Sequence, residues 1–267
     1  MAAPITAQAL DGLPEVAAGD DLGALIAAAL PDGAPASDQV VVVAHKIVSK
    51  AEGRTRSLAS VTPGERATRL ARELGGRGRG SGPSPAPPAN KDPRHVQVVL
   101  HESAEIRRSA HGVVISVTTH GFVCANAGVD ASNSPDDDTL ILLPADPDRS
   151  ARQLRARLRE LTGIAPAVLI TDSFGRAWRH GQCDVAIGCA GLAPLEDWRG
   201  RADSRGRELK STWIAVADQV AAAADLARAK DARQPVVLIG GARRWVTPDD
   251  GPGAQALLRG SETDLFR

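Results

Sequence analysis

Two short stretches of the sequence carry an acidic side chain beside a hydroxyl or an amide, a combination that can hold a metal ion. In the first stretch, Asp130 is followed by Ser132 and Asn133. In the second stretch, Asp172 and Ser173 come directly after the apolar run 167–171. Hard cations such as Mg²⁺ and Mn²⁺ take oxygen ligands of these kinds, often together with phosphate oxygens. Two such stretches in one chain favour a metal site with ligands from both.

Each stretch also has a purely structural alternative, which these residues alone leave open. Asp130 and Asn133 could hydrogen-bond a turn, as Asp and Asn side chains commonly do. Asp172 could cap a helix that follows it. A ligand role for Asp172 is favoured by its place after a buried strand, because ligands of open α/β sheets collect beyond the carboxyl ends of strands. An acid next to a hydroxyl is also the pair with which some phosphoryl-transfer sites hold metal.

Cationic and aromatic side chains follow the second stretch closely. They are Arg176, Trp178, Arg179 and His180. Arginine suits bidentate contact with phosphate or carboxylate, and Lys46 and Lys50 could bind the same groups as point charges. Any one of these residues could instead be an ordinary surface cation. No G-x-x-x-x-G-K-[ST] motif occurs, which excludes a P-loop nucleotide fold.

The composition limits the classes of partner. Lys plus Arg number 32 and Asp plus Glu number 32, so no net charge draws the chain to nucleic acid or to an anionic membrane. An anionic substrate must therefore be held by a local cluster of cations. The three cysteines form no C-x-x-C pair, which fits a reducing compartment. No secretory signal and no apolar run of about 20 residues is present, so we expect a cytoplasmic protein.

Helices and strands that could position these residues are mixed along the whole sequence. Hydrophobic periodicity and capping residues predict helices after Asp21, over 65–74, from Asp92 through Ile106, from Ser150 to Gly163 and over 209–224. Apolar runs predict strands over 40–44, 112–118, 121–125, 167–171 and 235–239. The Gly-, Pro- and Ser-rich segment at about 75–90 is predicted to be a flexible insert. We predict one α+β (mixed α/β) domain over residues 1–267.

Several short motifs, in this order along the chain, resemble those of the coenzyme F420-0:L-glutamate ligase family, also called the γ-glutamyl ligases of that coenzyme. The matching segments are 12–16, 19–22, 46–53, 120–133, 143–148, 171–176, 181–188 and 217–218. The resemblance runs from about Leu13 to Phe266, which is nearly the whole chain. Several motifs in the right order are far more specific than any one of them.

The resemblance implies an activity and its partners. It implies GTP-dependent ligation of L-glutamate to coenzyme F420-0 by an amide (γ-glutamyl) bond, through an acyl phosphate, in coenzyme F420 biosynthesis. The cofactors that it implies are a divalent metal, Mg²⁺ or Mn²⁺, with K⁺ as a further candidate. It also implies an intertwined homodimer of mixed α/β structure. Some relatives carry a fused nitroreductase-like domain, and we expect none here.

The resemblance also implies roles for particular residues. Asp130 and Asp172 would ligate the first divalent cation and Ser173 a second one. Independently of the resemblance, we expect Arg176, as a further catalytic residue, and Arg179 to bind glutamate or the phosphate of the coenzyme. The residues implied to line the GTP site are Leu13, Pro14, Glu15, Val16, His45, Lys50 and Asn133. A nucleotide loop would fall around 229–235, where Lys230 stands at a position that can carry a neutral metal-contacting side chain in relatives.

Two other functions remain alternatives. A metal-dependent phosphohydrolase or phosphotransferase would use the same carboxylates but would consume GTP without glutamate. A non-catalytic GTP-binding homologue would bind nucleotide and metal and release no phosphate. Departures from the family pattern at Thr119, Cys183 and Lys230 favour the second alternative, and the intact stretches around Asp130 and Asp172 disfavour it.

Overall fold

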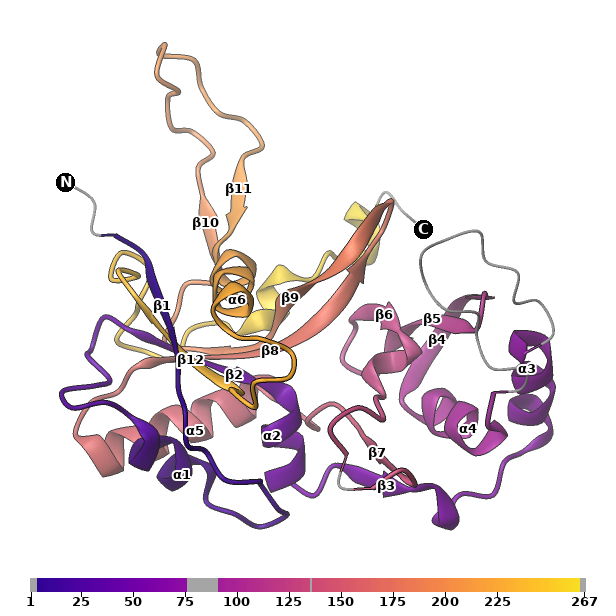
Figure 1. Cartoon of the computed structure of the whole chain (residues 1–267). Coiled ribbons are helices and arrows are strands. Elements are labelled where there is room, and N and C mark those ends of the chain that lie inside the picture. Colours follow the sequence, from indigo (N-terminus) through magenta and orange to yellow (C-terminus); the bar gives the residue numbers. More distant parts are fainter. Residues whose placement is uncertain (1–3, 76–90, 135, 265–267) are drawn as a thin grey trace. The chain divides into compact units, whose positions relative to one another are not determined.

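The chain folds into two compact units, each of which contains helices and strands. The computed structural model describes residues 4–75, 91–134 and 136–264. The larger unit consists of Met1–Ala51 with Asp146–Arg267, and the smaller unit is Glu52–Ala145 (Figure 1). The mixed α/β character confirms the predicted α+β class. The predicted insert lies outside the described residues except for Gly75, the last residue of a helix.

A five-stranded sheet forms the centre of the larger unit, with the strand order β1-β12-β2-β8-β9. The strands are β1 (Thr6–Ala9), β2 (Val40–Ala44), β8 (Ala167–Arg176), β9 (Arg179–Ala190) and β12 (Val236–Gly240). β2 and β8 are parallel, and the other neighbouring pairs are antiparallel. The first four residues of β2 are valines with no exposed surface, because the strand is covered on both faces. The predictions of β2 and β12 are confirmed.

Helices cover both faces of this sheet (Figure 1). They are α1 (Leu22–Ala29), α2 (His45–Ala51), α5 (Pro147–Thr162) and α6 (Val216–Ala227), with the short 3₁₀ helices η3 (Ala254–Leu257) and η4 (Ser261–Thr263). The buried side of α6 packs on one face together with alternate residues of β2 and β8, such as Val42 and Leu169. Asp21 caps α1 by accepting the Ala24 N–H at 3.0 Å, as predicted. No helix in the described part of the chain is long and apolar enough to cross a membrane.

Two predicted helix starts in the larger unit are wrong. α5 begins at Pro147 and not at Ser150, because Asp146 is the capping residue and accepts the Arg149 N–H at 2.9 Å. α6 begins at Val216, several residues after the predicted start at 209, because the preceding segment forms the short strand β11. The predicted end of α5 is confirmed, since Gly163 takes the left-handed conformation that ends many helices.

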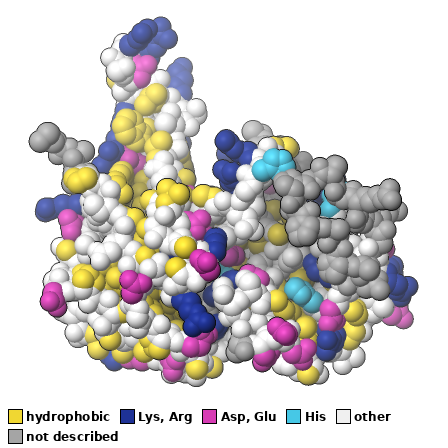
Figure 2. Space-filling view, viewed as in Figure 1, with side chains coloured by type: hydrophobic (Ala, Val, Ile, Leu, Met, Phe, Trp, Pro, Cys, Tyr) yellow, Lys and Arg dark blue, Asp and Glu magenta, His cyan; other side chains and the backbone are white. Residues whose placement is uncertain are grey.

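A long arm projects from the larger unit between Leu195 and Ala215 (Figure 1). Strands β10 (Leu195–Asp197) and β11 (Trp213–Ala215) pair at its base. Lys and Arg side chains gather at its tip (Figure 2). The guanidinium of Arg199 lies 4.4 Å from the ring centroid of Trp213, so cation–π contact helps to order the arm.

The smaller unit has its own sheets and its own core. Its elements are β3 (Thr55–Ser57), η1 (Leu58–Ser60), α3 (Glu65–Gly75), α4 (Pro93–His101), β4 (Ser103–Ala110), β5 (Val113–Thr118), β6 (Val123–Ala125), η2 (Asn126–Gly128) and β7 (Thr139–Ile141). β4, β5 and β6 form one sheet, and β3 pairs with β7. Asp92 caps α4 as predicted, but the helix ends at His101, where the predicted helix ran on through Ile106. Ser103 accounts for the stop, because it begins β4 while its hydroxyl donates to the Val99 carbonyl at 2.6 Å.

One glycine of the larger unit is required by a close approach of two elements. A Cβ on Gly188 of β9 would lie 2.3 Å from the Pro147 carbonyl oxygen at the start of α5. We therefore expect Gly188→Ala to lower the free energy of unfolding by about 1–3 kcal/mol. Urea unfolding checks this value, with Gly175→Ala as the control, since a Cβ on Gly175 meets no atom within 4 Å. Equal unfolding midpoints for the two variants would contradict the prediction.

Candidate functional site

Asp172 and Ser173 lie inside β8, and not beyond its end as the sequence suggested. β8 continues to Arg176 because it forms a long hairpin with β9, in which Ser173 lies opposite Asp184. The strand continues past Asp172 and the next element is β9, so the alternative that Asp172 caps a helix is wrong. β8 nevertheless changes character here, since Thr171 is buried and Asp172 is the first half-buried residue of the strand.

The Asp172 carboxylate is held by two neighbours through one of its oxygens. Oδ1 accepts the Ser173 N–H at 2.8 Å. Oδ1 also lies 3.3 Å from Nε2 of His45, the first residue of α2, and this pair becomes an ion pair when His45 is protonated. The ring is set on its other side by a 3.4 Å contact between Nδ1 and the hydroxyl of Ser49. α2 and β8 together fix the position of the carboxylate.

Asp172 is suited to carry a negative charge at neutral pH. Burial by itself would raise the pKa of its carboxyl, and the side chain is 16% exposed. The neighbouring His45, the Ser173 N–H and the charge of Lys46 outweigh burial, so the pKa of Asp172 lies below its usual value. The carboxylate is therefore ionised where a metal ion or a phosphate-bound cation would need it.

The chemistry of these donors fits a hard divalent cation. Both contacts of Asp172 use Oδ1, and within the described residues no hydrogen bond reaches Oδ2. A carboxylate oxygen is the kind of ligand that Mg²⁺ and Mn²⁺ take, with water and phosphate oxygens completing the shell. Among the described residues, no group of three or more His, Cys, Asp or Glu side chains is placed to hold a metal ion.

Asp184 on β9 is the centre of a buried polar network that sequence reasoning missed. Its side chain is 1% exposed. Oδ1 accepts the Ser173 hydroxyl at 2.6 Å, and Oδ2 accepts the Thr171 hydroxyl at 2.8 Å. Oδ2 also accepts from the guanidinium of Arg228, the residue that ends α6. The segment 181–188 was part of the family resemblance, but only the hairpin register places Asp184 opposite Ser173.

Cations from the segment after α6 complete this network. Arg228 is 10% exposed and also donates to the Thr171 hydroxyl at 3.0 Å. Lys230 donates to the Ser173 hydroxyl at 2.7 Å and to Asp225 at 3.3 Å. We predicted a nucleotide loop around 229–235, and the structure brings the start of that segment to Ser173.

The residues predicted to line a GTP site belong to the larger unit, except for Asn133, which belongs to the smaller unit. In the larger unit, Lys50 in the last turn of α2 pairs with Glu15, which ties the irregular segment 11–17 to that helix. Val16 is buried, Leu13 is half-buried and Pro14 is exposed. His45 contacts Asp172 directly. The structure therefore joins Glu15 to Lys50 and His45 to Asp172.

Arg176 lies apart from these contacts, at the outer end of β8. It is exposed, and its guanidinium donates to the His180 carbonyl across the hairpin turn at 2.7 Å. Four residues of extended strand separate it from Asp172, which corresponds to about 13 Å. Trp178, in the same turn, is 83% exposed. Arg176 could therefore contact a remote part of a long substrate that also reaches Asp172.

Asp130 and Asn133 belong to the smaller unit. The Asp130 backbone pairs with Ile141, and its carboxylate accepts both the N–H and the hydroxyl of Ser132 at 2.8 Å. The turn contact considered for Asp130 is therefore present. Asn133 follows in the left-handed region with φ 57°, and it is exposed. Both Asp130 and the hydroxyl of Ser132 present oxygen atoms near the surface.

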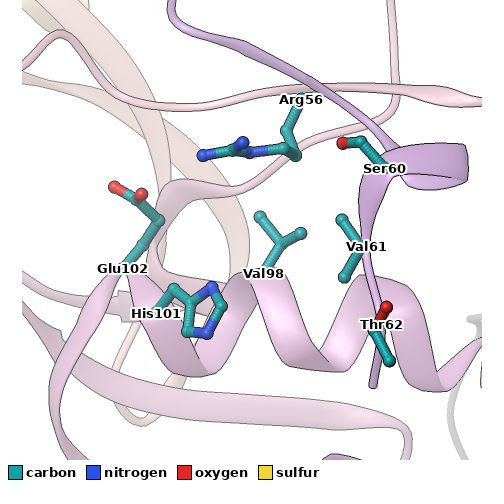
Figure 3. Close-up of a pocket in the computed structure, with 7 residues that line it drawn as sticks. All are labelled: Arg56, Ser60, Val61, Thr62, Val98, His101 and Glu102. Carbon is teal, nitrogen blue, oxygen red and sulfur yellow. The ribbon is translucent and has the colours of Figure 1, made fainter. Parts of the chain in front are cut away.

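A small open pocket of about 150 Å³ lies elsewhere in the smaller unit (Figure 3). Its lining residues are Arg56, Ser60, Val61, Thr62, Val98, His101 and Glu102. In Figure 3 the guanidinium of Arg56 points toward the side of the pocket where Glu102 lies, and Val98 lies next to Val61. None of these residues was predicted to act in the site, and Glu102 is already paired with Arg54 at 2.7 Å. We therefore assign the pocket no role in the chemistry.

Comparison with known proteins covers nearly all of the chain. The model of the F420-0:Gamma-glutamyl ligase family matches residues 12–241. The coenzyme F420:L-glutamate ligase of Methanothermobacter thermautotrophicus is 42% identical over 261 residues, which are 97% of each chain. The protein of the same name from Methanopyrus kandleri is 43% identical over 257 residues, covering 95% of this chain and 94% of the relative. That from Haloarcula marismortui is 41% identical over 262 residues, covering 97% and 94%. The chain is therefore a ligase that belongs to the F420-0:gamma-glutamyl ligase family.

Proposed function

We propose that this protein ligates L-glutamate to coenzyme F420-0 through a γ-glutamyl amide bond, with GTP as the second substrate, in coenzyme F420 biosynthesis. The observation that carries the proposal is the similarity of about 42% identity over 97% of the chain to proteins named coenzyme F420:L-glutamate ligase. The ionised Asp172 carboxylate supplies a chemical group that such a reaction needs.

The proposed reaction proceeds through an activated carboxyl group. A carboxylate does not accept an amine directly, because its oxygen is a poor leaving group. Transfer of the γ-phosphoryl group of GTP to the carboxylate of F420-0 gives an acyl phosphate and GDP. The glutamate amine then attacks the acyl carbon, the C–O bond to phosphate breaks, and inorganic phosphate leaves. The amine loses a proton as the amide forms.

Asp130 and Asp172 are the proposed ligands of one divalent cation, Mg²⁺ or Mn²⁺. When bound, such a cation neutralises the charge on the nucleotide phosphates and orients the γ-phosphoryl group. His45 of α2 helps to orient the Asp172 carboxylate, because its Nε2 lies 3.3 Å from Oδ1. The family resemblance also implies a second cation at Ser173, but the Ser173 hydroxyl is bonded to Asp184 and Lys230 in this structure.

The remaining predicted residues are assigned to substrates. Lys50 and the segment 13–16, which it joins through Glu15, are proposed to line the GTP site together with His45 and Asn133. Arg176 is proposed to bind glutamate or the phosphate of F420-0, because it is exposed and its guanidinium is held at the hairpin turn. K⁺ remains a further candidate cofactor. We also propose that the protein acts as an intertwined homodimer in the cytoplasm.

A single reconstitution tests this function. Purified protein is incubated with GTP, Mg²⁺, L-glutamate and F420-0, and products are followed by mass spectrometry and by phosphate release. We expect F420-0 to gain a glutamyl unit, with one phosphate released per unit added. Phosphate release that does not depend on glutamate would instead identify a phosphohydrolase. Binding of GTP and metal without phosphate release would identify a non-catalytic homologue.

A further inference from the structure

The ammonium group of Lys230 occupies the space next to the Ser173 hydroxyl. Nζ donates to Ser173 Oγ at 2.7 Å and to Asp225 Oδ1 at 3.3 Å, and it lies 3.9 Å from Asp184 Oδ1. The side chain as a whole is 69% exposed. A long lysine side chain on the surface gives up rotamer freedom when its end is fixed. Three oxygen atoms around one ammonium group are the contacts that offset this loss.

These contacts leave the network electrically balanced without a metal ion. Its two carboxylates are Asp184 and Asp225, and its two cations are Arg228 and Lys230. Arg228 neutralises Asp184 from the buried side, and Lys230 approaches from the exposed side. A divalent cation added at Ser173 would give this group of residues an excess positive charge.

The hydroxyl of Ser173 is also largely committed. Its single proton is donated to Asp184 at 2.6 Å, and one of its two lone pairs accepts from Lys230. A metal ion on the same oxygen would lie about 2.0–2.1 Å from it, so the ion and the ammonium group would be close neighbours. Like charges this close repel each other even at a protein surface, and the repulsion from a divalent ion is twice that from a monovalent ion. Lys230 and a divalent ion therefore compete for Ser173.

We propose that Lys230 is the resident cation at Ser173, and that this protein binds one divalent ion per active site. That ion is bound at Asp130 and Asp172 and not at Ser173. In this arrangement the ammonium group of Lys230 donates to the γ-phosphate of GTP, a role for which the point charge of lysine is suited. Lys230 can reach the phosphate because most of its side chain is exposed. This inference rests on the proposed GTP-dependent function and changes its metal requirement from two ions to one.

The experiment counts bound Mn²⁺ by electron paramagnetic resonance, at saturating concentrations of a non-hydrolysable GTP analogue. We expect one Mn²⁺ per chain for the wild type, two for Lys230→Asn, and one for Lys230→Arg, which keeps the positive charge. Lys210→Asn, on an exposed lysine of the arm, is the matched control and should remain at one. Circular dichroism spectra verify that each variant is folded.

Two Mn²⁺ ions on the wild type would overturn the inference, as would a count for Lys230→Asn that does not rise. The count does not depend on glutamate or on F420-0. A protein that binds one Mn²⁺ as described but forms no glutamyl product would therefore contradict the proposed function and not the role of Lys230. Absence of Mn²⁺ and nucleotide from the wild type would contradict both.

Discussion

Asp172→Asn is expected to abolish ligation while leaving the fold intact. Asparagine has nearly the same shape and can still accept the Ser173 N–H through its side-chain oxygen, a bond of 2.8 Å in the wild type. It loses the negative charge that the proposed cation requires. Loss of one preorganised electrostatic group costs roughly 10²–10³-fold in kcat in well-studied enzymes, and we expect at least this loss.

Steady-state kinetics of glutamyl transfer measure the effect of Asp172→Asn, and urea unfolding verifies the fold. Asp197→Asn is the matched control, because Asp197 lies on a strand of the same unit and pairs with a surface arginine, Arg199, at 2.7 Å. The control should keep wild-type turnover. An Asp172→Asn variant with wild-type activity and unchanged dependence on the divalent metal would remove Asp172 from the site.

Arg228→Met is expected to lower the free energy of unfolding by about 3–5 kcal/mol. Removal of the guanidinium leaves Asp184, which is 1% exposed, without its principal countercharge. A buried carboxylate in that position must either remain ionised at high cost or take up a proton. The Thr171 and Ser173 hydroxyls continue to donate to Asp184, so they limit the loss but do not replace the charge.

Urea unfolding at neutral pH measures this loss, and two further variants support its interpretation. Arg201→Met removes an exposed arginine that pairs with Glu196 at 3.3 Å, and it should change stability by no more than about 0.5 kcal/mol. The double variant Arg228→Met with Asp184→Asn should lose less free energy of unfolding than the two single variants lose together, because it contains no uncompensated buried charge. Strictly additive losses would show that the pair does not act as described.

The sequence was most informative where local chemistry decides the structure. The apolar run at 40–44, four valines and an alanine, was predicted to be a buried strand, and it is one. Asp21 and Asp92 cap helices because their side chains accept hydrogen bonds from N–H groups two or three residues ahead. Gly163 ends α5 because glycine tolerates a positive φ. The two helix starts and the helix end depend on residues within one turn of the chain.

The sequence was least informative where distant segments meet. The apolar run ends at Thr171, so the prediction ended the strand there, but pairing with β9 extends β8 to Arg176. That same pairing places Asp184 opposite Ser173, and Arg228 reaches Asp184 from the end of α6. These residues lie too far apart in the sequence for a local pattern to predict their contact. Asp172 was found because it stands beside a hydroxyl after an apolar run, whereas Asp184 carries no such local signal.

We propose one shared cation at the nucleotide phosphates, with Asp130 and Asp172 as its ligands. Anomalous diffraction from crystals grown with Mn²⁺ and a non-hydrolysable GTP analogue tests it most directly. We predict one Mn²⁺ peak within about 2.0–2.6 Å of an oxygen of each carboxylate and of a phosphate oxygen. Separate Mn²⁺ peaks at the two residues, or a Mn²⁺–nucleotide complex that neither residue touches, would contradict the claim.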